Sequence, residues 1–128
     1  MTENELSYKI IGAAIDVHRN LGPGLLENTY ETALAYELKT LGLEAKQQLV
    51  LPLKYKEITI ENAYKIDLIV ENKVIVEVKA VLELHPVIYS QVLTYLKLTD
   101  HKLGLLINFN TELIKHGIHR IVNILINE

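Results

Sequence analysis

The chain has 128 residues, of which 49% are hydrophobic and 23% charged, which predicts a single globular domain over residues 1–128 with a substantial core. Its net charge of −3 disfavours a protein that coats nucleic acid but leaves open an enzyme that touches a few phosphates beside a cation, and the lack of cysteine excludes disulfides, thiolate metal sites and a cysteine nucleophile. No apolar run can span a bilayer and the acidic start is unlike a signal peptide, so we expect a cytoplasmic protein with no membrane partner.

Two helices are predicted in the first third of the chain. Apolar residues recur at helical spacing from Leu6 to Asn20, and the segment Gly22-Pro23-Gly24 ends that helix. A second helix is predicted from Leu25 to Leu41, because Gly42 is suited to the position after a helix end.

Extended segments follow. Residues 44–56 alternate weakly and contain Pro52, which is typical of an edge strand or of a strand with an interruption. Residues 58–70 and 74–80 are mostly apolar and are separated by three polar residues, so they predict a β-hairpin.

The last third predicts a helix, a buried strand and a final element. Pro86 suits a helix start and residues 87–98 have a helical pattern, while residues 103–109 are almost all apolar and predict a strand buried on both faces. Residues 113–126, interrupted by Gly117, are a helix or a strand. The order α-α-β-β-β-α-β plus a tail predicts an α/β domain, a mixed central sheet flanked by helices, in which the last helix connects parallel strands.

A charged patch is predicted at the end of the hairpin. Asp67 lies in its first apolar run, and Glu77 and Lys79 share one face of the second because strand side chains alternate. If residues 71–73 form the loop, Asp67 lies opposite Glu77. Two carboxylates and an ammonium group suit a hard divalent cation beside an attacking water. The alternative is an ordinary strand with a charged solvent face, but the flanking runs are too apolar for a wet edge.

Polar residues also lie on the predicted helices. Glu27 shares a helical stripe with core leucines, so it is either a carboxylate stabilised by the helix dipole or a third acidic ligand. Gln91 and Tyr95 are four residues apart and share a face of the third helix. They either form a half-buried polar pair bonded to backbone, or contact substrate and orient the carboxylates.

Five segments in this order resemble a known family. Residues 24–30 match the pattern G-x-x-E-x-x-Y, and the others are residues 64–70, 74–80, 91–97 and 104–110. Together they resemble the small prokaryotic GxxExxY proteins, a branch of the PD-(D/E)XK nuclease superfamily, from about Leu6 to Asn123. One departure is that Ile66, rather than proline, precedes Asp67.

The resemblance implies the restriction-endonuclease-like core, with an acidic site on the central hairpin. Asp67, Glu77 and Lys79 would be the Asp, D/E and Lys of the motif, and Glu27 would match an acidic residue that an early helix contributes. Gln91 and Tyr95 resemble the Q-x-x-x-Y element of RecB-like nucleases. The expected catalytic residues are Asp67, Glu77, Lys79, Glu27 and Gln91; the substrate-binding residues are Tyr95 and Tyr30; and the metal ligands are Asp67, Glu77, the Val78 carbonyl and Glu27.

The function that this resemblance implies is a Mg²⁺- or Mn²⁺-dependent nuclease that hydrolyses phosphodiester bonds, with DNA favoured over RNA. Lys79 would position or deprotonate the attacking water. The acidic net charge leaves open a catalytically inactive module for binding or assembly on the same fold. A further alternative is a small junction-resolving endonuclease acting as a homodimer, because a domain of this size offers little surface to grip a branched substrate.

Overall fold

A five-stranded mixed sheet forms the centre of the computed structural model, which describes residues 1–124. The strands lie in chain order from one edge to the other: β1 (Ala45–Tyr55), β2 (Ile58–Val70), β3 (Val74–Lys79), β4 (Leu103–Asn108) and β5 (Ile118–Val122). Strands β3 and β4 are parallel, and the other neighbours are antiparallel. The predicted α/β class and the crossover between parallel strands are confirmed.

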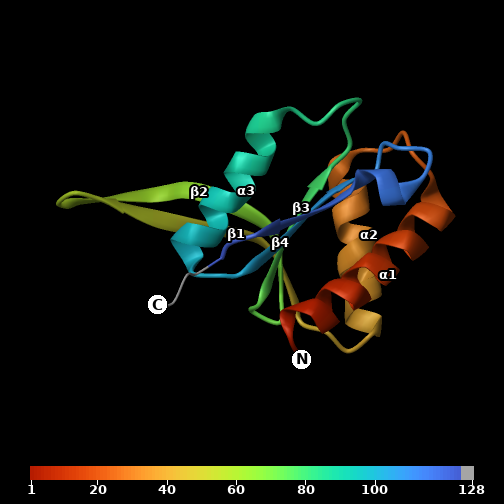
Figure 1. Ribbon diagram of the computed structural model, residues 1–128, viewed down its shortest axis with the longest axis horizontal. Helices are drawn as coiled ribbons and strands as arrows, with labels where there is room; N and C mark the ends of the chain where they lie inside the picture. Colours follow the sequence, from red (N-terminus) through yellow and green to blue (C-terminus); the bar gives the residue numbers. More distant parts are fainter. Residues whose placement is uncertain (125–128) are drawn as a thin grey trace.

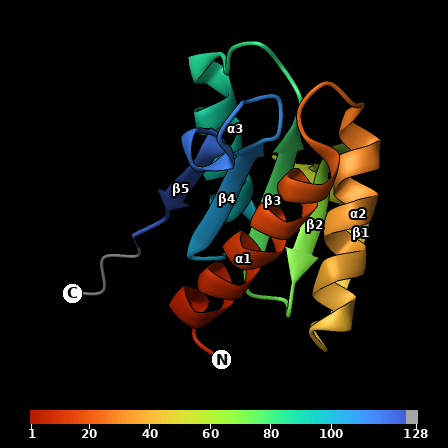
Figure 2. The same cartoon turned by 90° about the vertical axis from the view of Figure 1, so that its right-hand side faces the viewer.

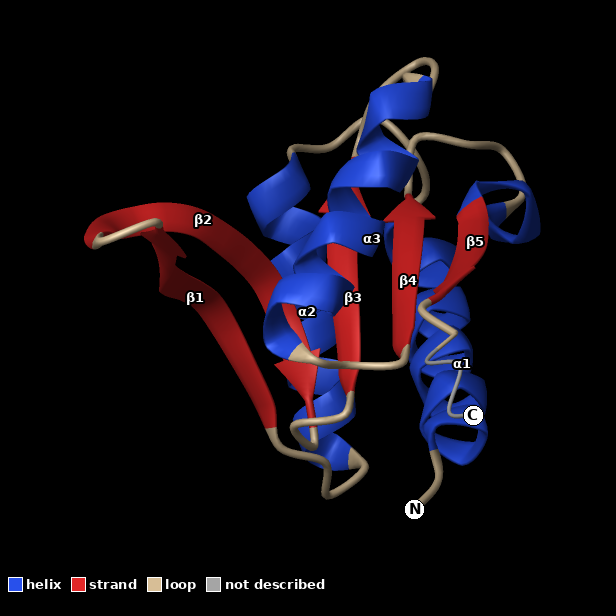
Figure 3. Cartoon of the chain, turned by 60° about the vertical axis from the view of Figure 1, so that its left-hand side comes forward, coloured by secondary structure: helices blue, strands red, loops and turns tan. Residues whose placement is uncertain are grey.

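Helices cover both faces of the sheet. Helices α1 (Glu3–Leu21) and α2 (Glu27–Thr40) pack on one face, whereas α3 (Pro86–Thr99) covers the other, as Figures 2 and 3 show. Thr2 and Glu5 form a reciprocal capping box at the start of α1, which satisfies backbone N–H groups that the first turn cannot pair. None of these helices is long and apolar enough to cross a membrane.

The packing of α3 depends on a glycine. A Cβ on Gly104 of β4 would lie 2.8 Å from Cγ1 of Val92, so a larger residue would require Val92 of α3 to shift. The cluster beneath α3 contains Ile69, Ile75 and Leu96. Strand β4 is buried along its whole length, as the apolar run predicted.

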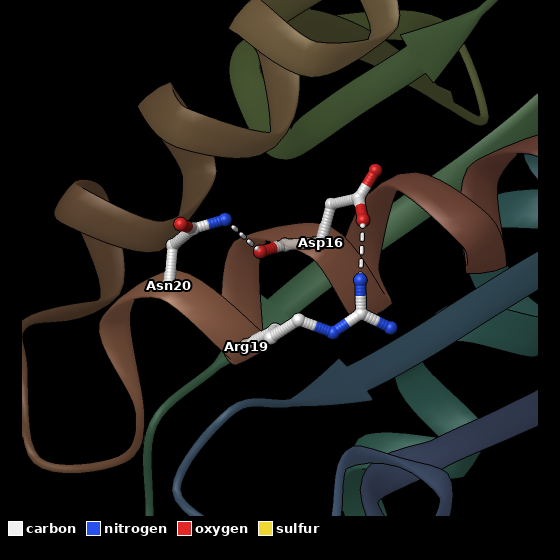
Figure 4. A network of polar contacts seen from close by, with 3 residues as sticks. All are labelled: Asp16, Arg19 and Asn20. Atoms are coloured by element: carbon white, nitrogen blue, oxygen red, sulfur yellow. Dashed lines mark hydrogen bonds and ion pairs between the residues drawn. The ribbon is translucent and has the colours of Figure 1, made fainter.

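The last turns of α1 carry an exposed polar network (Figure 4). Nη1 of Arg19 lies 3.2 Å from Oδ1 of Asp16, and Nδ2 of Asn20 donates to the Asp16 carbonyl at 2.7 Å. An exposed ion pair of this kind contributes only ~0–1 kcal/mol to stability. Burial of the apolar helix faces, rather than this network, therefore holds α1 on the sheet.

The segment after β4 resolves an ambiguity of the sequence. The predicted element at residues 113–126 is a short 3₁₀ helix, Ile114–Gly117, followed by strand β5. A Cβ on Gly117 would overlap the carbonyl of Asn108, so glycine allows the chain to cross β4 closely before it pairs with that strand. Residues 125 and 126 of the predicted element lie outside the described residues.

The ribbon formed by β1 and β2 extends well beyond the sheet (Figure 1). Leu68 packs in the cluster beneath α1 and α2, whereas Ile66, two positions earlier, packs in the cluster beneath α3. The ribbon therefore changes faces between these residues, at Asp67 and at Gln48, whose φ of 54° is left-handed. Two-stranded ribbons twist more strongly than wide sheets. The rule that residues two apart share a face therefore fails here for Ile66 and Leu68. Asp67 consequently lies where the two layers of the domain meet.

Candidate active site

Asp67 and Glu77 contact each other through the backbone where β2 and β3 separate. The ladder between these strands ends with the pair Leu68 and Val76, and the same register places Asp67 opposite Glu77. Instead of a ladder bond, the backbone N–H of Asp67 donates to Oε1 of Glu77 at 3.1 Å. The N–H of Val78 donates to Oδ2 of Asp67 at 2.9 Å. The structure thus brings together the two carboxylates that the hairpin register predicted.

Glu77 is the buried member of this pair, with only 4% of its surface exposed. Burial, together with the nearby charge of Asp67, raises the pKa of Glu77 to about 8. The positive charge of Lys79, which shares a face of β3 with Glu77, acts in the opposite direction. Near neutral pH the carboxyl of Glu77 therefore retains a proton, which lets two acidic groups lie together.

A second buried carboxylate reaches this region from α2. Glu31 is 6% exposed, and its oxygens accept from Nε2 of Gln47 at 2.9 Å and from Nε2 of Gln48 at 2.6 Å. The same Gln48 nitrogen lies 3.4 Å from Oδ1 of Asp67. Glu31 is therefore linked to the acidic pair through the carboxamide of Gln48, although Glu31 lies on a helix and the pair lies on the sheet.

Gln91 and Tyr95 approach the site from α3. Nε2 of Gln91 donates to the Tyr95 hydroxyl at 2.7 Å, and the ring of Tyr95 stacks on Tyr64 with centroids 5.2 Å apart. Burial raises the pKa of Tyr95, and the negative charges of Glu77 and Asp67 add to that rise. The predicted pair forms, with Tyr95 buried and Gln91 exposed.

Comparison with known protein families identifies the family of this chain. Residues 4–121 match the family model described as the PD-(D/E)XK nuclease superfamily. The chain belongs to the PD-(D/E)XK nuclease superfamily. Within it the chain is a member of the GxxExxY branch, as the sequence motif indicated. No curated protein and no solved structure gave a significant match.

The motif that gives this nuclease branch its name forms the start of α2. Glu27 is the first residue of the helix, and its side chain is exposed. The helix carboxylate that the structure links to the acidic pair is Glu31, one turn later.

The tyrosine of the motif is a core residue in this nuclease fold. The ring of Tyr30 is fully buried and stacks on Phe109 with centroids 4.7 Å apart. Its hydroxyl donates to the Gly22 carbonyl at 2.6 Å and accepts from the Leu25 N–H at 3.0 Å. Tyr30 thus fixes the loop between α1 and α2, and the structure does not bring it to a surface where a substrate could contact it.

Members of the superfamily typically use a divalent metal. Within residues 1–124, no three acidic or histidine side chains are close enough to hold one ion together. Mg²⁺ is often held by one or two carboxylates, with water completing an octahedral shell. Asp67 and Glu77 supply two such hard oxygen donors, so the donor chemistry fits, while the expected third ligand Glu27 is not among them.

Sequence reasoning missed Glu31, although a signal for it existed. Glu31 lies three residues before the buried Leu34 and seven before the buried Leu38, which is the same helical register that drew attention to Glu27. Its neighbour Tyr30 is also buried. The two adjacent glutamines Gln47 and Gln48, the third and fourth residues of β1, are the donors that a buried carboxylate requires.

Proposed function

We propose that this protein is a metal-dependent nuclease that hydrolyses phosphodiester bonds, with DNA as the favoured substrate. The observation that carries the proposal is the Asp67–Glu77 pair, two carboxylates joined through backbone N–H groups where two central strands separate. Lys79 follows Glu77 on the same face of β3. Superfamily membership supplies the reaction class, and the pair supplies the chemical groups.

In this proposal Asp67, Glu77 and the Val78 carbonyl would hold Mg²⁺ or Mn²⁺, which would supply an activated water and neutralise phosphate charge. To act as a ligand, Glu77 would release its proton to solvent. The ammonium group of Lys79 positions the attacking water and stabilises negative charge that develops on the phosphate oxygens.

In this proposal Glu31 and Gln91 act through neighbouring residues rather than reacting. Glu31 fixes the carboxamide of Gln48, and Gln48 in turn approaches Asp67. Gln91 orients the hydroxyl of Tyr95, which lies in the field of the two acids. Such supporting residues typically change activity by about 10–100-fold when they are removed.

The test is cleavage of a panel of DNA and RNA substrates with Mg²⁺ or Mn²⁺. We expect metal-dependent cleavage that is lost in Glu77→Ala and in Lys79→Ala. Asp16→Ala is the matched control, because it removes an exposed carboxylate from α1 and disturbs only the surface pair with Arg19. Cleavage that persists in both site variants would sink the assignment.

One observation favours a second function, a metal-free binding or assembly module. Both oxygens of Asp67 already lie near protein donors, and Glu77 retains a proton near neutral pH. These features would stabilise a site that no longer takes a metal. Calorimetric titration with Mn²⁺ separates the two functions: the nuclease requires that wild type bind the ion and that Asp67→Ala bind it far more weakly, whereas equally weak binding supports the module.

A further inference from the structure

A groove lies between α3 and the ribbon formed by β1 and β2. Its volume is about 410 Å³, within the range of pockets that hold small organic groups. Leu53 and Tyr64 line the ribbon side, and Val87, Tyr95 and Leu98 line the helix side. None of the residues lining it is charged, which sets this groove apart from the acidic pair nearby.

The apolar surface of the groove continues along the ribbon. Leu51 pairs with Tyr64, Leu53 with Ile60 and Tyr55 with Ile58, and directly opposed residues share one face of an antiparallel pair. Beyond the groove this face is uncovered, since Ile58 and Tyr55 are 58% and 54% exposed. The ribbon therefore presents an apolar track that leads outward from the groove.

The inner end of the groove meets the candidate active site. Tyr95 lines the groove and also packs in the cluster that contains Ile66 and Ile75. Ile66 directly precedes Asp67, and Ile75 lies two residues before Glu77 on the same face of β3. Gln91, which holds the Tyr95 hydroxyl, lines the groove as well. A molecule in the groove would thus end beside the two carboxylates.

We propose that this groove binds the unpaired bases of a single-stranded segment next to the bond that is cut. The inference rests on the proposed nuclease function and names the form of its substrate. A duplex turns its charged phosphates outward and hides the faces of its bases, so it offers nothing to a neutral apolar groove. Unpaired bases expose their flat faces, which bind to aromatic and apolar side chains with little dependence on sequence.

Polar groups on the groove suit the edges of bases. Ser90, Gln91 and Thr94 line it together with the apolar residues, and they offer hydroxyl and amide groups that both donate and accept hydrogen bonds. Such groups tolerate any of the four bases, because each base edge carries donors or acceptors. We therefore expect a preference for single strands without a strong preference for sequence.

The experiment measures binding of labelled oligothymidine and of a blunt duplex of equal length by fluorescence anisotropy, in EDTA so that no strand is cut. We expect the single strand to bind at least about tenfold more tightly, the effect of roughly one stacked base. The double variant Val87→Gln/Leu98→Gln should lose most of this preference without a change in charge. Both side chains are substantially exposed, at 60% and 43%, so the variant should fold.

Two further variants keep the result interpretable. Leu53→Gln, on the opposite wall of the groove, should give the same loss of preference. Tyr36→Gln removes an exposed ring from α2, away from the groove, and should keep the full preference. Equal binding of single strand and duplex, or a preference that folded groove variants retain, would overturn the inference and leave the groove to some other occupant such as a protein segment.

The outcomes also separate this inference from the proposed function. A metal-dependent nuclease that prefers duplex, and whose groove variants behave as wild type, would keep the function and remove the groove proposal. Groove-dependent binding of single strands without any metal-dependent cleavage would keep the groove proposal and remove the catalytic one.

Discussion

Glu27 and Glu31 lie one turn apart on α2, and both fall in register with the buried Leu34 and Leu38. Yet Glu27 is exposed, whereas Glu31 is buried and held by two carboxamides. Helical register gives the side of a helix on which a residue lies, but not how far along its axis the neighbouring layer extends. Here Glu31 meets the carboxamides of Gln47 and Gln48 on β1 while Glu27 is exposed, so the same residue type on the same stripe has two different environments.

The buried glutamates Glu31 and Glu77 extend the comparison, because each avoids an isolated buried charge in its own way. Glu31 is compensated by N–H donors from Gln47 and Gln48. Glu77 accepts one backbone N–H and otherwise keeps its proton, as its raised pKa shows. Only the second arrangement leaves a group that a cation can recruit by displacing a proton.

The largest effect expected from this difference is on stability against pH. The pKa of Glu77 is about 8 in the folded protein and 4.5 for an ordinary glutamate, so between these values the unfolded chain loses a proton that the folded protein keeps. The free energy of unfolding should therefore fall as pH rises from about 4.5 to 8, by up to several kcal/mol. Glu77→Gln, which mimics the protonated acid, should remove this fall and be the more stable protein at pH 8.

Urea unfolding of both proteins at pH 5 and pH 8, in EDTA, measures this effect. Groups away from the acidic pair titrate alike in the two proteins, so the difference between wild type and Glu77→Gln reports the titration of the coupled Asp67–Glu77 pair. Equal stability differences at both pH values would show that Glu77 ionises normally in the folded protein.

Glu31 should matter next, for activity as well as stability. Glu31→Ala leaves the carboxamides of Gln47 and Gln48 without their acceptor and frees Gln48 from its place beside Asp67. We expect a loss of about 1–3 kcal/mol in unfolding free energy and a fall of about 10–100-fold in cleavage rate. Glu31→Gln separates charge from shape: if it restores stability but not the rate, the negative charge itself acts on the site.

Much of this fold follows from local patterns that the sequence displays. Helical spacing predicted the three helices. The polar residues 71–73 predicted the hairpin turn that brings Asp67 opposite Glu77. Helical register places Glu31 on the buried side of α2, but its link to Asp67 did not follow, because that link depends on the left-handed backbone at Gln48 and on the ribbon changing faces there. That change is a property of strand twist and of layers that are distant in the chain, which neither alternation nor helical register encodes.

Tyr30 tests whether the motif at the start of α2 is structural. Tyr30→Phe removes the hydroxyl that bonds to the Gly22 carbonyl and to the Leu25 N–H, while the stacked ring remains against Phe109. We expect a loss of about 1–3 kcal/mol in stability, because a part-buried N–H loses its acceptor, with little change in cleavage rate under conditions where the variant is folded. Thermal unfolding and the cleavage assay, run on the same sample, distinguish this from a role in substrate binding.

The smallest effect is expected at Glu27. Its size tests whether Glu27 or Glu31 is the residue of α2 that serves the site. As an exposed residue in the first turn of α2, Glu27 interacts favourably with the helix dipole by ~0.3–1 kcal/mol. Glu27→Ala should cost no more than that, and should change Mn²⁺ affinity far less than Asp67→Ala does. A loss of metal affinity as large as that of Asp67→Ala would mean that α2 moves when the ion binds, so that the motif glutamate reaches the acidic pair after all. Isothermal titration of the Glu27→Ala and Glu31→Ala proteins with Mn²⁺, side by side, therefore identifies which turn of α2 serves the site.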